Sequence, residues 1–405
     1  MTRAPSLLRT RGAARVLAVA TLVNTFGNGL FYTSSVLFFT RVLRMSIAQV
    51  GVGLSVAGVC GMLAGVPFGH LADRRGPREV LVALMLLAGV VMAAYAVVGE
   101  FWAFLLVACL ATLLDRGAGA VRQAMVASVG APEDRVRTRA YLRSLTNVGM
   151  GLGSLVAGVA IHVDTRPAYL ALVLGNAGTY WLAAGVLTRL PAAAPVPRES
   201  GPRLPVLRDR PYLLLAALNG VLSMHFSMIE IAVPLWVVND TSAPRWTVAL
   251  VFGLNTLVVA LFQVRASAGT GDVARSAAAV RASGVLIAVA CLVFAAAGHR
   301  AAWVSTVLLV VAALVHVVGE MRQSAGGWGI AFGLAPDHLQ GQYQGLSLSA
   351  FGMASALAPI VMTTAVSAGV LGWAVLALVF LGSAAVQVPV SSWALGRRPE
   401  PVLWV

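Results

Sequence analysis

Apolar runs of about 20 residues, long enough to cross a lipid bilayer as helices, alternate with short polar segments along nearly the whole chain. Twelve such spans use most of the 405 residues and leave too few for a large soluble domain. The pattern therefore predicts an all-α membrane protein with 12 transmembrane helices. The expected spans are residues 16–40, 46–68, 79–99, 101–124, 139–162, 168–189, 211–238, 246–264, 282–298, 301–326, 343–367 and 371–394.

A proline-rich segment near the middle of the chain separates the spans into two sets of six. Residues 191–210 hold five prolines together with several charges, a composition typical of an extended linker. A loose internal repeat supports the division, since Ala131-Pro132-Glu133 after the fourth span matches Ala335-Pro336-Asp337 after the tenth. We expect two pseudo-symmetric six-helix bundles, residues 1–190 and 211–405, related as the halves of a transporter.

Composition and charge placement narrow the class further. The chain is 59% hydrophobic and 11% charged, with a net charge of +14. All 29 basic residues are arginine, a bias that indicates a bacterial genome. Of these, 21 fall on the side of the termini and five on the other, so both termini should be cytoplasmic. Because the arginines cluster between spans, without a basic helix rich in stacking aromatics, we expect no nucleic-acid partner.

The first apolar run follows Arg15 closely and continues to Thr40, so it is interpreted as a retained helix and not a cleaved secretory signal. Cys60, Cys109 and Cys291 each lie inside an apolar run, as small core residues do. No nucleotide-binding loop or Cys/His metal cluster is apparent in the sequence. We therefore expect no enzyme, no cofactor and no metal. The expected protein is a monomeric, multi-pass protein of the bacterial inner membrane whose partners are lipid, protons and a small-molecule substrate.

A short basic segment, Gly69 to Glu79, separates the second and third predicted spans. Its glycines permit a sharp reversal and close backbone approach. Its arginines favour the cytoplasmic face of the membrane. We predict a tight turn that joins two antiparallel helices.

The same segment resembles the signature loop between helices 2 and 3 of the major facilitator superfamily, Gly-x-Leu-Ala-Asp-Arg-x-Gly followed by basic residues. Pro77 departs from the pattern, where a basic residue is usual. The resemblance implies that Asp73 stabilises one access state by facing a helix N-terminus in the other half. It also implies that this segment takes part in the conformational switch between access states. The matching residues are Gly69, Leu71, Ala72, Asp73, Arg74, Gly76, Arg78 and Leu81.

Two further segments resemble the 12-helix drug/proton antiporter branch of that superfamily. Arg116 in the fourth span is similar to an arginine implicated in proton movement. Alternatively, Asp115 and Arg116 neutralise neighbouring groups and fix helix packing. The run Gly149-x-x-x-Gly153-Ser154-x-x-Ala157-Gly158 in the fifth span is similar to an exporter motif. The glycines of this run indicate tight packing against a neighbouring helix. The resemblance implies that the protein exports its substrate.

Ionisable residues inside predicted spans are the main functional candidates, because charges at membrane depth are costly and usually retained for a purpose. His316 and Glu320 lie one helical turn apart and share a face with Gln323. Such a pair could pass a proton or hold a polar substrate; alternatively, it is a static hydrogen-bonded pair. The proposed proton-coupling set is Glu230, Glu320, His316, Asp115 and Arg116.

Glu230 has no basic residue in its own span, so it needs a distant partner or must be protonated. A reversible proton carrier requires this property. Pro234, one turn further on, should bend the helix and open backbone groups to a cavity. Alternatively, Glu230 forms a salt bridge with Arg116 or Arg322.

Polar side chains in the spans are candidates for binding a substrate. Alternatively, they hydrogen-bond neighbouring helices. The candidates are Asn24, Asn28, Tyr32, His225, Gln323 and Arg322.

These features together predict a secondary active transporter that exports small amphipathic molecules, such as drugs or secondary metabolites, by proton-coupled alternating access. One alternative is a proton-coupled symporter that imports a small nutrient. Another is a non-transporting membrane receptor or scaffold built on the same fold.

Overall fold

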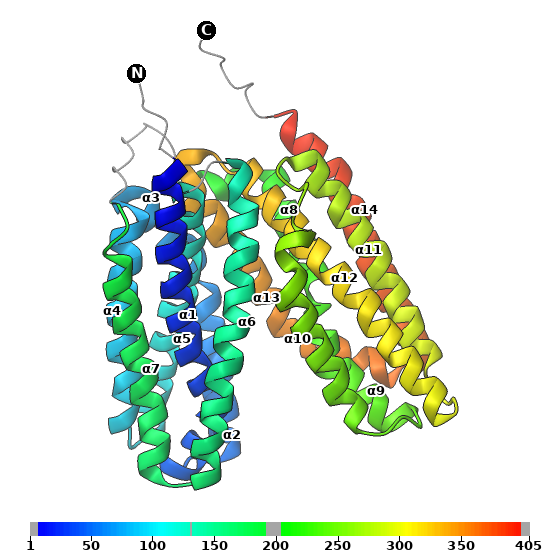
Figure 1. Cartoon of the computed structure of the whole chain (residues 1–405), viewed down its shortest axis with the longest axis horizontal. Coiled ribbons are helices and arrows are strands. Elements are labelled where there is room, and N and C mark those ends of the chain that lie inside the picture. Colours follow the sequence, from blue (N-terminus) through cyan, green and yellow to red (C-terminus); the bar gives the residue numbers. More distant parts are fainter. Residues whose placement is uncertain (1–6, 130–131, 192–203, 398–405) are drawn as a thin grey trace. The chain divides into compact units, whose positions relative to one another are not determined.

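The computed structural model describes residues 7–129, 132–191 and 204–397, and all the regular elements in these ranges are helical (Figure 1). Eleven helices are long and apolar enough to cross a membrane, and a bent pair makes a twelfth span if it is counted as one. The chain is therefore an all-α protein with the helices of a multi-pass membrane protein. The predicted linker falls largely on residues 192–203, outside the described residues.

Contacts between residues divide the chain into two compact units. Unit 1 comprises Met1–Gly201 together with Pro336–Ser349, and unit 2 comprises Pro202–Ala335 together with Ala350–Val405. The main division falls inside the predicted linker. The segment Pro336–Ser349, which the sequence assigns to the second half, packs with unit 1.

In unit 1, helix α1 (Leu7–Leu37) packs along α6 (Pro132–Val163) and α7 (Arg166–Leu187). Helix α4 (Pro77–Ala94), at the left edge of Figure 1, packs against both α7 and α5 (Phe101–Val129), and α5 also packs against α2 (Ile47–Met62). Edge-to-face and tilted aromatic contacts join α1 to its neighbours. Such packing buries large apolar rings in complementary orientations. The contacting rings are Phe31, Phe38, Phe39, Tyr95 and Phe104.

In unit 2, α11 (Val273–Ala296) packs against α12 (Ala302–Leu334) and α14 (Gly369–Leu395). Helix α14 also contacts α8 (Arg210–Ser223), and α10 (Trp246–Ala266) packs on α12. Helix α13 (Gln340–Ser367) begins in unit 1 and continues into unit 2. Trp236, from α9 (Val233–Asp240), packs edge-to-face on Trp373 and donates a hydrogen bond of 2.8 Å to the carbonyl of Phe294.

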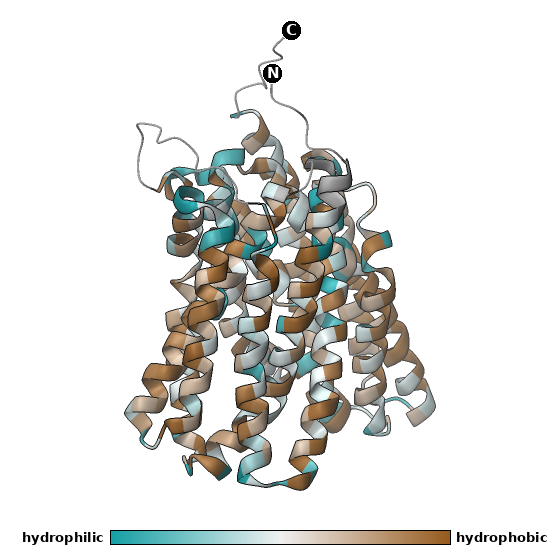
Figure 2. Ribbon diagram, turned by 60° about the vertical axis from the view of Figure 1, so that its left-hand side comes forward, coloured by the Kyte–Doolittle hydropathy of each residue, from teal (hydrophilic) through white to brown (hydrophobic). Residues whose placement is uncertain are grey.

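In both units, hydrophobic residues predominate along the lengths of the helices, and hydrophilic residues gather at their ends (Figure 2). Many large apolar side chains are exposed on these helices, for example Leu155 at 73% and Leu378 at 69%. A membrane explains such exposure, since lipid tails solvate apolar side chains as well as a protein core does.

The segment predicted as an eleven-residue turn is mostly helical, so that prediction is wrong. Helix α3 (Gly65–Arg75) contains most of it, and Gly76 alone makes the reversal, with φ of 94°, before Pro77 starts α4. Glycine adopts this left-handed φ at little cost, and proline fits the first position of a helix. The real break lies before α3, where the axis bends by 42° after α2.

Several helices extend beyond the predicted spans. Helix α6 begins at Pro132 and not at 139, so Arg135 and Arg137, which the predicted spans leave outside a helix, lie on its first two turns. The seventh span, Arg210–Asp240, is irregular: α8 ends at Ser223, and a π-helix, η4 (Met228–Ala232), precedes α9. The irregularity therefore precedes Pro234. A second π-helix, η1 (Phe38–Val42), continues α1.

The glycines of α6 differ in their surroundings. A Cβ on Gly149 or Gly153 would collide with α1, so these two positions set the close approach of the two helices. A Cβ on Gly158 would meet no atom within 4 Å, so this glycine does not take part in the contact, contrary to the predicted packing role.

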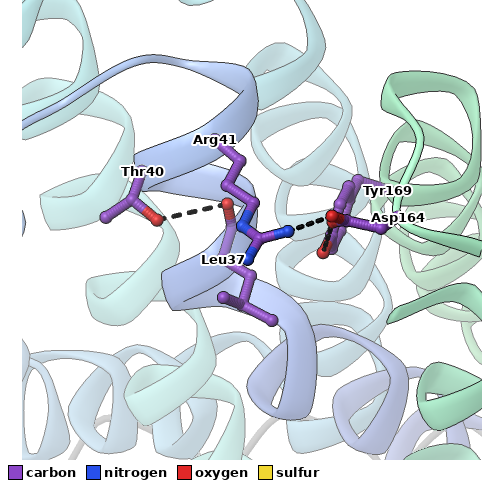
Figure 3. A network of polar contacts seen from close by, with 5 residues as sticks. All are labelled: Leu37, Thr40, Arg41, Asp164 and Tyr169. Atoms are coloured by element: carbon purple, nitrogen blue, oxygen red, sulfur yellow. Dashed lines mark hydrogen bonds and ion pairs between the residues drawn. The ribbon is translucent and has the colours of Figure 1, made fainter. Parts of the chain in front are cut away.

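A polar network fastens the end of α1 to the connection between α6 and α7 (Figure 3). Arg41, in η1, forms an ion pair with Asp164, and the Tyr169 hydroxyl donates a hydrogen bond of 2.7 Å to the same carboxylate. Asp164 itself has a left-handed φ of 47°. Two interactions hold the pKa of Asp164 below its usual value. The hydrogen bond from the Tyr169 hydroxyl has the larger effect, and the contact with Arg41 has the next largest.

This network should make a small, pH-dependent contribution to stability. A depressed carboxylate pKa stabilises the fold above the unfolded value of about 3.9, and the contribution disappears as pH falls through the folded pKa. Asp164→Asn is therefore expected to lower the unfolding temperature of the purified protein at pH 7 and at pH 5 by a similar, small amount. As the pH falls through the lowered folded pKa of Asp164, the unfolding temperatures of the variant and the wild type should converge. A difference that persists or grows in acid would contradict this assignment.

Candidate transport sites in the two units

Unit 1 contains a polar network centred on α5 and α1. The Tyr180 hydroxyl, from α7, lies 3.2 Å from Asn28 Oδ1 and 3.3 Å from Asp115 Oδ1, so it can donate to either. Tyr32 also interacts with Asp115, and both are close to Arg116. The structure thus brings four of the predicted residues together around a tyrosine that the sequence did not indicate.

A second contact extends this network along α5. Arg122 Nη2 donates a hydrogen bond of 2.8 Å to Asn24 Oδ1, and Asn24 is only 1% exposed. Arg122 also interacts electrostatically with Asp115 and Tyr180. Predicted substrate-binding and proton-coupling residues of the first half therefore form one connected set within unit 1.

Unit 2 holds a buried histidine pair. His225 Nδ1 lies 3.1 Å from His316 Nε2, and both side chains are 0% exposed. His225 lies in the turn between α8 and η4, and His316 lies on α12. One of the two facing nitrogens must donate and the other accept, so the contact survives only while at least one ring is neutral.

Glu320 follows His316 by one helical turn and is 4% exposed. Asn255, from α10, donates a hydrogen bond of 2.8 Å from Nδ2 to Glu320 Oε2. One further turn along α12, Gln323 donates hydrogen bonds to Asn219 Oδ1 at 2.9 Å and Ser223 Oγ at 3.2 Å. The predicted polar face of α12 is present, and α8 and α10 supply its hydrogen-bonding partners.

Two predicted residues lie differently from expectation. Glu230 was expected to be deeply buried, but its side chain, carried by the π-helix η4, is exposed; Glu320 is close enough to interact with it electrostatically. Arg322 is exposed and lies off the buried face of α12, so it does not join the cluster around Glu320. π-Helices are frequent at functional sites, which keeps Glu230 a candidate.

Asp73, near the end of α3, contacts the first turn of α13 within unit 1. Its carboxylate accepts hydrogen bonds from the backbone N–H groups of Gly341, at 2.7 Å, and Gln342, at 3.0 Å. Gly69 and Gly341 pack backbone to backbone, so a side chain on either would collide with the other. A carboxylate at a helix N-terminus satisfies free N–H groups and complements the helix dipole.

A family model, that of the Major Facilitator Superfamily, matches residues 17–363. The chain belongs to the major facilitator superfamily. Proteins of this superfamily are transporters. The contact of Asp73 with the N-terminus of α13 is the one that the sequence resemblance implies. A role of Asp73 in switching between access states is a proposal.

Several relatives and solved structures resemble this facilitator. The tetracycline resistance protein, class C, of Escherichia coli is 25% identical over 224 residues, which cover 55% of the chain and 56% of that protein. The chain therefore spans about half the length of this curated relative.

Among solved structures, a bacterial homologue of the iron transporter ferroportin in an outward-facing state has a TM-score of 0.72 at 16% identity, covering 95% of this chain and 100% of that one. The human organic anion transporter MFSD10 gives 0.67 at 16% identity, covering 93% and 99%. The proton:xylose symporter XylE gives 0.71 at 10%, covering 97% and 96%. These structures support the facilitator fold and nothing finer.

The two networks of this facilitator differ in chemistry. Unit 2 gathers groups that exchange protons readily, two imidazoles and a carboxylate, with neutral amides around them. Unit 1 gathers arginines, tyrosines and asparagines around one carboxylate. The first arrangement suits storing a proton, and the second suits holding a polar ligand.

The Asp73 contact should stabilise this facilitator measurably. Asp73→Asn keeps one acceptor oxygen but loses the charge, so we expect the free energy of unfolding to fall by about 1–2 kcal/mol. Asp73→Ala removes both acceptors and should destabilise more. Chemical or thermal unfolding in detergent measures both variants. Equal effects of the two substitutions, or none, would contradict the contact.

Proposed function

We propose that this facilitator exports small amphipathic molecules across a bacterial inner membrane, coupled to proton entry, with both termini in the cytoplasm. The export cycle would use alternating access, as expected of a transporter with binding groups inside its spans. Protons would bind and leave groups in unit 2. The substrate would bind polar groups of unit 1.

One observation carries the proton-coupling part: the fully buried His225–His316 pair lies one helical turn from the buried carboxylate of Glu320. Histidine is the side chain that titrates nearest neutral pH. Ionisable groups buried inside transmembrane helices commonly mark proton relays. In this proposal, a proton that reaches Glu320 would pass on to the imidazole pair, whose His316 lies one helical turn away on α12.

Export is favoured over import by two observations. The curated relative at 25% identity is a tetracycline resistance protein. The glycines Gly149 and Gly153, which carry the resemblance to an exporter motif, pack directly against α1. Proton-coupled import of a nutrient is the second candidate, and the polar α1, with Asn24 and Asn28 inside the network, would suit it.

Everted membrane vesicles with an acidified lumen and a fluorescent reporter of the pH gradient test this function. Tetracycline, cationic dyes and neutral metabolites are added in turn, and vesicles lacking the protein are the control. Partial collapse of the gradient by a compound, only in vesicles that contain the protein, is the expected result.

Three other results would each contradict a part of this proposal. Substrate accumulation in right-side-out vesicles driven by inward proton flow would replace export with symport. Substrate movement that ignores the pH gradient would remove proton coupling. Absence of movement in either direction for every compound would favour the receptor or scaffold interpretation.

A further inference from the structure

One polar face of α1 leads from an exposed position into the buried interior of unit 1. Thr21, Asn24, Asn28 and Tyr32 follow one another at intervals of three or four residues, so they share this face. Tyr32 is 52% exposed and Asn28 is partly buried, whereas Asn24 is 1% exposed and Thr21 is 3% exposed. The face therefore presents a continuous row of polar groups that runs inward from Tyr32.

A contact with α5 fixes the orientation of the Asn24 amide. Arg122 Nη2 lies 2.8 Å from Asn24 Oδ1. A guanidinium group has donors only, so the oxygen of the amide, and not its nitrogen, must face Arg122. The amide nitrogen Nδ2 then points elsewhere, and it is buried without a hydrogen-bonding partner in the part of the chain that the structure describes.

The hydroxyl of Thr21, one turn before Asn24, is buried in the same way and has no hydrogen-bonding partner among the described residues. Buried polar groups are nearly always hydrogen-bonded in native proteins, because an unpaired one is costly. The N–H groups of an amide can only donate, and a threonine hydroxyl can donate as well. A ligand that satisfies both groups therefore supplies an acceptor oxygen.

The geometry points to a binding site for a carbonyl oxygen of the substrate at the Asn24 amide N–H group and the Thr21 hydroxyl. This inference rests on the proposed transport function and specifies its substrate class: the transported amphipathic molecule carries a carbonyl group. A water molecule also presents an acceptor oxygen. The continuity of this face with the exposed Tyr32 favours the substrate.

Binding by the purified protein in phosphatidylcholine nanodiscs tests the site without any pH gradient. The probes are matched pairs of ketone and hydrocarbon, 9-fluorenone with fluorene and 1-indanone with indane, which differ by one carbonyl oxygen but hardly in shape. Thermal unfolding over a range of probe concentrations reports binding, and empty nanodiscs correct for partition into lipid. We expect the wild type to bind each ketone about tenfold more tightly than its hydrocarbon.

Asn24→Asp should abolish the preference for the ketones. The new carboxylate has the shape of the amide and keeps an acceptor for Arg122, but it replaces the N–H donors with a second acceptor. Thr21→Val removes only the hydroxyl and should reduce the preference in part. Asn239→Asp is the matched control, because it makes the same change at an exposed position of α9. Gel filtration and the unfolding temperature without probe verify that each variant is folded.

Equal binding of ketone and hydrocarbon by the wild type, or no binding of either, would overturn the inference. An unchanged preference in Asn24→Asp would overturn it in favour of a purely structural role for the amide. If Asn24→Asp does not fold, Thr21→Val decides, and an unchanged preference there overturns the inference. Failure of proton coupling in vesicles would leave a measured ketone preference intact. The two proposals can therefore fail separately.

Discussion

Glu320→Gln is expected to reduce substrate-driven proton movement to the level of vesicles without the protein, while the variant stays folded and still binds substrate. Glu320 is buried, and Asn255 donates a hydrogen bond to its carboxylate. Glutamine has nearly the same volume and keeps one acceptor oxygen for Asn255, but it cannot take up or release a proton near neutral pH. The substitution therefore separates proton exchange from packing.

Everted vesicles measure the proton movement, and substrate-dependent thermal stabilisation of the purified variant measures binding. Glu100→Gln is the control, since it makes the same change at an exposed position between spans. Full proton movement in Glu320→Gln would exclude Glu320 as the coupling group and direct attention to Asp115 in unit 1. Loss of binding together with proton movement would indicate a structural role.

The number and order of the helices could be predicted because bilayer thickness fixes the length of an apolar run. Their ends could not. Helix α6 starts at Pro132, since a helix remains favourable beyond the apolar core, where arginines reach polar surroundings. The segment after Gly69 looked like a loop by its charges and glycines, yet only Gly76 has a conformation that interrupts the helix.

The candidate site was predictable where helices are regular. The face of α12 that carries His316, Glu320 and Gln323 follows from 3.6-residue periodicity, and all three are buried. The partnership of His225 with His316 was missed, because His225 lies in the turn that precedes η4. Periodicity assumes a continuous helix, and a turn followed by a π-helix changes which side chains face one another.

Hydrogen-bonding partners from other helices were also missed, Asn255 and Tyr180 above all. Asn255 lies with Thr256 in an otherwise apolar stretch. A polar residue isolated in this way inside a predicted span is a signal that could have indicated Asn255 as a partner. Tyr180 carries no such signal, since tyrosine is common in membrane helices. Which helices adjoin one another depends on tertiary packing, which one sequence does not reveal.

Gly153→Ala is expected to destabilise the protein strongly for a helix substitution that adds one methyl group. The new Cβ would meet the carbonyl oxygen of Phe26, the backbone nitrogen of Leu30 and the Cα of Gly29, all in α1. Backbone atoms cannot rotate away as a side chain can, so α1 and α6 must separate. Overpacking of this kind typically lowers the free energy of unfolding by about 1–3 kcal/mol.

Gly158→Ala, on the same helix, is the matched control. Its new Cβ would have no atom within 4 Å. Alanine is favoured over glycine in a helix by up to about 1 kcal/mol, so this variant should be as stable as the wild type or slightly more stable. Unfolding in detergent, by heat or denaturant, should therefore move in opposite directions for the two substitutions. Equal shifts would mean that helix propensity, and not the approach of α6 to α1, determines the effect of glycine in this motif.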